Sequence, residues 1–66
     1  MTETRPARIL VIDDEAPIRR FLDIVLGAGG FEMLEADRGR LGIERAATMA
    51  PDAVLLDLGL PDMDVK

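Results

Sequence analysis

The sequence predicts an α/β protein whose centre is a doubly wound parallel sheet with the element order βαβαβ, and three observations lead to this prediction. Apolar residues run without interruption through ILVI, residues 9–12, and AVLL, residues 53–56. Such continuous runs are typical of strands that are covered on both faces. Between them, apolar residues recur with the period of a helix from Pro17 onward. The expected strands begin about 22 residues apart, which leaves room for one helical crossover between parallel strands.

The first half of the chain contains a strand and a well-marked helix. We expect residues 1–7 to be a disordered lead-in, followed by a strand that ends at three consecutive acids. Pro17 suits the first turn of the next helix, where its missing N–H is not needed, and the glycines of GAGG, residues 27–30, can supply a left-handed stop. Arg19 and Arg20 are expected on the solvated face of this helix. Its apolar stripe consists of Ile18, Phe21, Leu22, Val25 and Leu26.

The second half continues with strand, helix and strand. FEMLEA, residues 31–36, predicts a strand that its two glutamates assign to an edge of the sheet. A helix is expected over residues 39–49, with Asp37 as a possible N-cap and Pro51 ending it, before the third strand at 53–56. The apolar side predicted for this helix consists of Leu41, Ile43, Ala46, Ala47 and Ala50.

Composition excludes several kinds of chemistry. The chain has 66 residues with 13 acidic and 8 basic side chains, a formal net charge of −5, and neither cysteine nor histidine. The negative charge disfavours nucleic acid and acidic membranes as direct partners and is compatible with binding a cation. Disulfides, thiolate zinc sites and imidazole catalysis are excluded, which leaves carboxylates as the reactive groups. Since no apolar segment could span a bilayer or serve as a signal peptide, we expect a cytoplasmic protein.

Acidic residues gather at the predicted carboxyl ends of two strands. Asp13 and Asp14 follow the first strand, and Asp57 follows the third, where a Gly/Pro loop begins. If the two helices cover opposite faces, the first strand lies between the others and these ends are neighbours about 5 Å apart. Because three carboxylates so close together repel one another, a cation would stabilise them. Mg²⁺ fits this ligand set, and a remaining carboxylate could attack phosphorus to form an aspartyl-phosphate.

The motifs resemble those of the receiver domains of two-component response regulators. The resemblance rests on ILVIDDE (9–15), IRRFL (18–22) and PDAVLLDLGLPDMD (51–64), and the last segment is especially similar to KdpE-type regulators of the winged-helix class of transcription factors. It implies a flavodoxin-like fold, of which the chain would hold the first three strands and two helices, with the sheet order 2-1-3. Residues 8–66 would then be the N-terminal part of an incomplete receiver domain.

The resemblance also implies a role for each acid and a set of partners. Asp57 would be the phosphoacceptor, and Mg²⁺ would be ligated by Asp14, Asp57 and the backbone carbonyl of Gly59, with Asp13 acting through water. A sensor histidine kinase would supply the phosphate, and the output would be transcription. DNA would be bound only through an output domain absent from this chain, and no membrane is involved. Such a module assists its own phosphotransfer and is not a turnover enzyme.

The chain departs from the family in two respects. The hydroxyl residue that ends the family's fourth strand and the lysine that ends its fifth have no counterpart, and Lys66 lies too close to Asp57 to be that lysine. Val65 stands where the family usually has glycine. Residues 53–56 would form an unpaired apolar edge in a chain of this length, so we expect self-association.

Other interpretations stay open at the level of sequence. The chain could be a half-receiver that retains the acids but does not switch, and that acts only in assembly. The acidic run after the first strand could merely cap the following helix. A haloacid-dehalogenase-type phosphatase would need a second Asp where Gly59 stands. GAGG resembles a dinucleotide-binding loop, but it follows a helix and precedes a strand, the reverse of the usual context.

Overall fold

The computed structural model describes residues 5–63, and the expected order of strands and helices is confirmed there. The α2 helix and β3 have the predicted bounds, α1 begins one residue before Pro17, and β2 excludes Phe31. Residues 1–4 of the expected lead-in and the predictions about Val65 and Lys66 lie outside the described residues. The elements are β1 (Arg8–Ile12), α1 (Ala16–Ala28), β2 (Glu32–Ala36), α2 (Gly39–Met49), β3 (Ala53–Leu56) and the short 3-10 helix η1 (Pro61–Met63).

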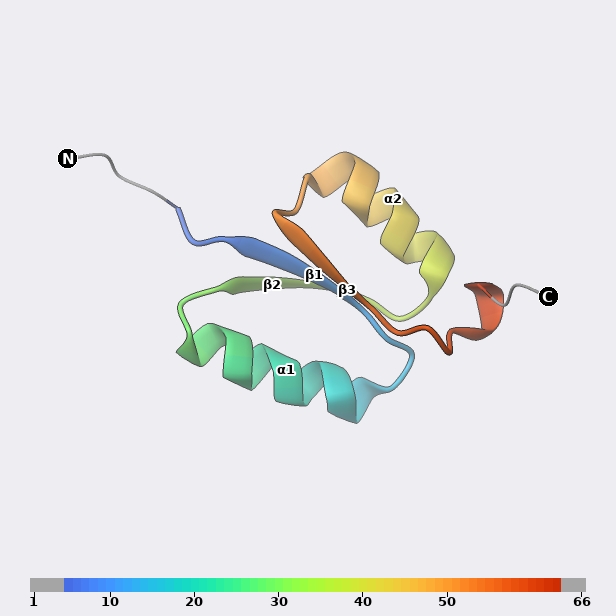
Figure 1. The fold of residues 1–66 in the computed structure, drawn as a ribbon, viewed down its shortest axis with the longest axis horizontal. Coiled ribbons are helices and arrows are strands. Elements are labelled where there is room, and N and C mark those ends of the chain that lie inside the picture. The colour runs from blue at the N-terminus through green and yellow to red at the C-terminus, as the bar shows by residue number, and fades with distance from the viewer. Residues whose placement is uncertain (1–4, 64–66) are drawn as a thin grey trace.

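The three strands form one parallel sheet in the order β2-β1-β3, so the predicted order 2-1-3 is confirmed. Ile12 at the end of β1 pairs with Ala36 of β2 and with Leu56 of β3. The carboxyl ends of all three strands therefore lie level at one edge of the sheet. The α1 helix covers one face and α2 the other (Figure 1). Doubly wound sheets of this kind bind their ligands at that edge.

The hydrophobic core lies between the sheet and α2. Its buried cluster consists of Leu10, Ile12, Ala36 and Leu60, with Leu34, Leu41 and Ala46 packed against it. Leu60 is only 2% exposed although it belongs to the loop after β3, a position that strand and helix periodicity did not mark as core. Ile43, predicted on the apolar side of α2, is instead exposed. Through Leu60, the loop after β3 is thus part of the core.

The end of α1 differs from the prediction in one respect, because the helix continues through Gly27 to Ala28. The backbone N–H of Phe31 donates to the carbonyl of Leu26 at 2.9 Å, and that of Gly30 donates to Gly27 at 3.0 Å. These paired hydrogen bonds define a Schellman motif. Gly30 has a φ of +87°, which an L side chain adopts only with strain, so Gly30 is the glycine that stops the helix.

The α2 helix approaches β1 closely at Gly42. A Cβ added to this residue would lie 2.7 Å from Cγ1 of Ile12, closer than real Cβ atoms come to their neighbours. A larger residue would therefore push α2 away from the sheet. This packing explains a glycine inside the helix, where glycine is otherwise unfavourable.

The predicted N-cap of α2 is wrong. Arg38 is the N-cap residue and makes no side-chain capping hydrogen bond, while Asp37 pairs with the Arg38 guanidinium at 3.1 Å. The first backbone N–H groups of the helix are satisfied from elsewhere, by the carboxylate of Asp62 in η1. The cap of α2 is therefore a tertiary contact, which a local pattern could not reveal.

Replacing Gly42 with alanine should destabilise the chain, whereas replacing Gly27 should stabilise it. At Gly27 nothing lies within 4 Å of an added Cβ, so the helix gains the roughly 1 kcal/mol by which alanine is favoured over glycine. At Gly42 the same gain is outweighed by overpacking against Ile12, which typically costs about 1–3 kcal/mol. Urea unfolding followed by far-ultraviolet circular dichroism should show midpoint shifts of opposite sign. Shifts of the same sign would contradict the close approach of α2 to β1.

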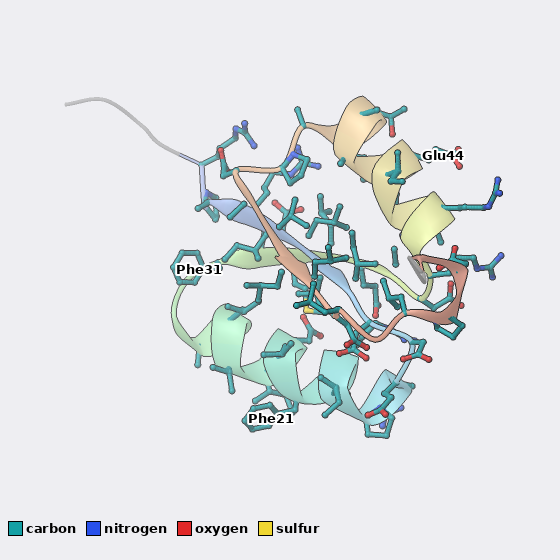
Figure 2. The ribbon with its side chains drawn as sticks, turned by 45° about the vertical axis from the view of Figure 1, so that its right-hand side comes forward. Phe21, Phe31 and Glu44 are labelled. Atoms are coloured by element: carbon teal, nitrogen blue, oxygen red, sulfur yellow. The ribbon has the colours of Figure 1, made fainter. Side chains whose placement is uncertain are left out.

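Two apolar surfaces are exposed. Phe21 is 61% exposed on α1 and points away from the sheet (Figure 2), and no residue of α1 is fully buried. Every residue of β3 is exposed, and within the described part of the chain β3 pairs only with β1. The unpaired, apolar third strand expected from the sequence is therefore present. None of the helices in residues 5–63 is long and apolar enough to cross a membrane.

Candidate functional site

Three carboxylates meet at the carboxyl ends of β1 and β3. Asp13, Asp14 and Asp57 each offer one oxygen, and these oxygens all lie within 4.8 Å of one another. The sheet produces this arrangement, because the backbone N–H of Asp57 donates to the carbonyl of Ile12 at 3.0 Å, directly before the acidic pair. The N–H of Asp13 in turn donates to Ala36 of β2 at 3.0 Å. The convergence expected from strand order is therefore present.

Two of the acids are oriented by their own loops. Oδ1 of Asp57 accepts the backbone N–H of Gly59 at 2.9 Å, and Oδ1 of Asp13 accepts that of Glu15 at 2.9 Å. Both are Asx turns, in which a side chain bonds the backbone two residues further on. Within residues 5–63 neither carboxylate makes another side-chain hydrogen bond, so its second oxygen is left for a ligand.

The side chain of Glu15, the last of the three acids, does not cap α1. Glu15 is the N-cap residue of the helix and makes no side-chain capping hydrogen bond. Its backbone carbonyl accepts the N–H groups of Ile18 and Arg19, as helix geometry requires, and its carboxylate takes no part. No side-chain hydrogen bond from Glu15 supports the capping interpretation, and capping of α1 does not account for the approach of Asp57 to the acidic pair.

Arg19 fastens the loop that carries the acidic pair. Its guanidinium donates to the backbone carbonyl of Asp13 at 2.7 Å and, through Nε, to Glu35 of β2 at 2.8 Å. The prediction that Arg19 lies on a solvated face is wrong, since its side chain is only 18% exposed. The available signal was its place in the first turn of α1, beside the carboxyl ends of the strands. Arg19 therefore holds the loop of the acidic pair in place. Its guanidinium bonds to a backbone carbonyl and to Glu35, and not to the carboxylates of the site.

A hollow of about 210 Å³ opens beside the carboxylates, between the sheet and α1. Its apolar lining consists of Val11, Ile12, Leu22, Leu55 and Leu56. Asp13 and Asp57 supply its polar atoms. A water occupies roughly 30 Å³ in the liquid, so the hollow has room for several waters or for a phosphoryl group.

The donor set fits a magnesium ion. Mg–O distances of about 2.0–2.1 Å place oxygens on opposite sides of the ion about 4.2 Å apart. Carboxylate oxygens within 4.8 Å of one another need only a small contraction to reach that spacing, or one of them can act through water. All three carboxylates offer hard oxygen atoms, the kind of ligand that Mg²⁺ prefers. Asp14 is exposed, so the waters that Mg²⁺ usually retains can be accommodated.

Gly59 contributes to this site through its backbone. Its N–H orients Asp57, and a Cβ added to it would lie at an ordinary 3.5 Å from Oδ1 of Asp57. A side chain at position 59 is therefore sterically acceptable. The role predicted for its backbone carbonyl as a metal ligand stays a prediction.

Comparison with known proteins identifies the class to which this fold and site belong. Residues 9–64 match the response regulator receiver domain, and the chain belongs to this family. The resemblance inferred from the sequence motifs is confirmed, and membership removes the haloacid-dehalogenase alternative. The fold is that part of the flavodoxin-like receiver fold that holds three strands in the order 2-1-3.

Particular relatives refine the comparison. The chain is 46% identical over 56 residues to the KDP operon transcriptional regulatory protein KdpE of Escherichia coli K12, covering 85% of this chain and 25% of that protein. It is 49% identical over 55 residues to the transcriptional regulatory protein KdpE of Mycobacterium tuberculosis, covering 83% and 24%. The structure of the chemotaxis response regulator CheY4 of Vibrio cholerae matches with a TM-score of 0.84 and 29% identity, covering 88% of this chain and 48% of that one. The chain thus spans about a quarter of the KdpE relatives and about half of CheY4.

Proposed function

We propose that this chain is the phosphoacceptor part of a two-component response regulator, in which Asp57 takes a phosphoryl group from a sensor histidine kinase. The convergence of Asp57 with the acidic pair, at the ligand-binding edge of a receiver sheet, carries the proposal. Mg²⁺ is the cofactor, held by Asp14, Asp57 and the backbone carbonyl of Gly59, with Asp13 acting through water. When bound, the ion offsets negative charge on the nucleophile and on the incoming phosphoryl group.

The chemistry requires an ionised oxygen nucleophile of fixed orientation. A carboxylate oxygen of Asp57 attacks phosphorus, an O–P bond forms as the bond from phosphorus to the donor breaks, and the donor leaves with the electron pair. The hydrogen bond from Gly59 to Oδ1 restrains rotation of the carboxylate, which leaves its second oxygen for the attack. Because the product remains on Asp57, the module is a phosphoacceptor that assists its own phosphotransfer and not a turnover enzyme.

Similarity to KdpE regulators supports transcription as the output. DNA contact in this proposal belongs to an output domain outside the chain, because a net charge of −5 disfavours direct binding to phosphates. The division of the chain into a lead-in at 1–7 and part of a receiver domain at 8–66 stays a prediction. So does the cytoplasmic location.

A module that retains the acids only for assembly is the alternative, and a titration distinguishes the two. Beryllofluoride mimics a phosphoryl group on a carboxylate and needs both the nucleophile and the metal. A switching receiver should show amide shift changes in its NMR spectrum, at Asp57 and in η1, when Mg²⁺ and beryllofluoride are added together, and these should exceed the changes that Mg²⁺ causes alone. A response to neither, or to the metal alone, would favour the assembly module.

Replacing Asp14 with alanine should weaken Mg²⁺ binding far more than replacing Glu15. Asp14 belongs to the converging carboxylates, whereas Glu15 is the N-cap of α1 and lies outside the cluster. Loss of a residue that only supports a ligand lowers metal affinity by roughly tenfold or more. Loss of a direct ligand such as Asp14 should lower the affinity further. Isothermal titration calorimetry of the two variants checks this. Equal affinities would contradict the assignment of Asp14 as a ligand.

A further inference from the structure

Asp62 joins the loop after β3 to the start of α2. One oxygen of its carboxylate accepts the backbone N–H of Gly39 at 2.7 Å, and the other accepts that of Arg40 at 2.9 Å. Helices are usually capped by the N-cap residue itself, but Arg38 makes no such bond. In Figure 1, η1 lies against the first turn of α2.

The contact is charge-assisted. The pKa of Asp62 lies below its ordinary value of 3.8, chiefly because the N–H of Arg40, and then that of Gly39, donates to the charged form. Hydrogen bonds to an ionised carboxylate are shorter and stronger than those between neutral groups. At neutral pH, η1 is therefore held to α2 by an ionised group with two directed bonds.

The same helix is fixed against the strand that carries the acidic pair. Gly42 lies one turn into α2 and contacts the side chain of Ile12, the residue before Asp13. Rigid packing at this point gives α2 a defined position relative to the end of β1. The α2 helix thus contacts the two segments that flank the site. Gly42 contacts Ile12 at the end of β1, and the first turn of α2 binds Asp62 of η1.

A second anchor holds the loop between Asp57 and Asp62. Leu60 follows Gly59 directly and is buried with Ile12 and Ala36 beneath α2. Gly59 therefore lies between a nucleophile fixed by the sheet and a leucine fixed by the core. Beyond Leu60, the carboxylate of Asp62 binds the end of this loop to the first turn of α2.

We propose that Asp62 is a positioning residue for the metal and phosphoacceptor site. By holding η1 on α2, it fixes the far end of the loop that carries Gly59, and so the position of the Gly59 backbone relative to Asp57 and the acidic pair. The effect on metal affinity rests on the proposed function, but the effect on the loop does not. Asp62 itself touches neither metal nor phosphoryl group.

The experiment compares Asp62→Ala and Asp62→Asn with Asp52→Ala. Asp52 is a matched control, because its Oδ2 also accepts a backbone N–H from a distant segment, that of Arg8 at 2.7 Å. It precedes β3, however, and so lies at the opposite end of the sheet from the site. We expect about tenfold weaker Mg²⁺ binding by calorimetry for Asp62→Ala, a typical loss for a residue that supports a ligand. Asp52→Ala should bind as the unaltered chain does.

A second measurement needs no metal. The N–H of Gly59 donates to Asp57, so its hydrogen exchange reports on the loop itself. Exchange should accelerate in Asp62→Ala, accelerate less in Asp62→Asn, which keeps one carbonyl acceptor, and stay unchanged in Asp52→Ala. If the unaltered chain binds no Mg²⁺ but this exchange pattern appears, the proposed function fails and the positioning role stands.

Two outcomes would overturn the positioning role. Gly59 exchange and Mg²⁺ affinity in the folded Asp62 variants could equal those of the unaltered chain. Alternatively, both Asp62 variants could fail to fold while Asp52→Ala folds, which would show that Asp62 acts on stability alone.

Discussion

Replacing Asp57 with asparagine should abolish formation of an acyl phosphate on the chain when a small-molecule phosphodonor and Mg²⁺ are supplied. Asp57 follows β3 directly, offers an oxygen within 4.8 Å of an oxygen of each of the other two acids, and has a second carboxylate oxygen that takes no part in its own turn. An amide is a poor nucleophile, and it also removes one negative charge from the metal site. Radiolabelling followed by treatment with hydroxylamine, which cleaves acyl phosphates, measures the product. The prediction applies to a receiver domain that includes the family's later strands, on which the family carries its lysine and hydroxyl residues.

Two controls separate nucleophile from ligand. Asp52→Asn changes an acid at the other end of β3, and labelling should persist. Asp14→Asn removes a proposed metal ligand, so labelling should fall and recover in part at higher Mg²⁺ concentration. Labelling of Asp57→Asn at the level of the unaltered protein would assign the phosphate to another residue.

Local sequence patterns predicted those parts of the fold that local physics determines. Residues 39–49 and 53–56 formed the expected helix and strand, because apolar periodicity and Pro51 define them within a few residues. The meeting of Asp13 with Asp57 followed from one topological rule, that ligand sites lie at the carboxyl ends of parallel strands. Neither inference required knowledge of a side-chain contact.

Three features that the sequence did not predict depend on contacts between distant residues. Asp62 caps α2 across 22 and 23 positions, Leu60 fills a core assembled from two strands and a helix, and Arg19 bonds to Glu35 sixteen positions away. Asp37 was the obvious cap because it precedes the helix, but it pairs with Arg38 instead. A periodic pattern describes which face is apolar, not which loop residue reaches a helix end.

In isolation, the 66-residue chain should self-associate through β3, or else be only partly folded. Within the described residues β3 has no partner on its outer side, and the side chains of Val54 and Leu56 are 45% and 46% exposed. Burial of an illustrative ~600 Å² would contribute on the order of 15 kcal/mol gross at about 25 cal/mol per Å². Association and ordering cost roughly 4–15 kcal/mol, so the sign favours association while the affinity depends on how well two edges fit. Sedimentation equilibrium over the micromolar range measures the state.

The mode of association can be tested with a matched pair of lysine substitutions. Leu55→Lys places a charge on the free strand, which natural proteins use to prevent pairing of edges, and should leave a monomer. Ile43→Lys makes the same kind of change at another exposed apolar residue, since Ile43 is 58% exposed and Leu55 44%. Ile43 lies on α2, however, where no backbone groups are free to pair. This variant should still associate. If Ile43→Lys dissociates the chain and Leu55→Lys does not, association runs through α2. A compact monomer of the unaltered chain that unfolds cooperatively would mean that the open edge of β3 carries less free energy than its exposed apolar area implies, and that two helices and three strands are sufficient for this fold.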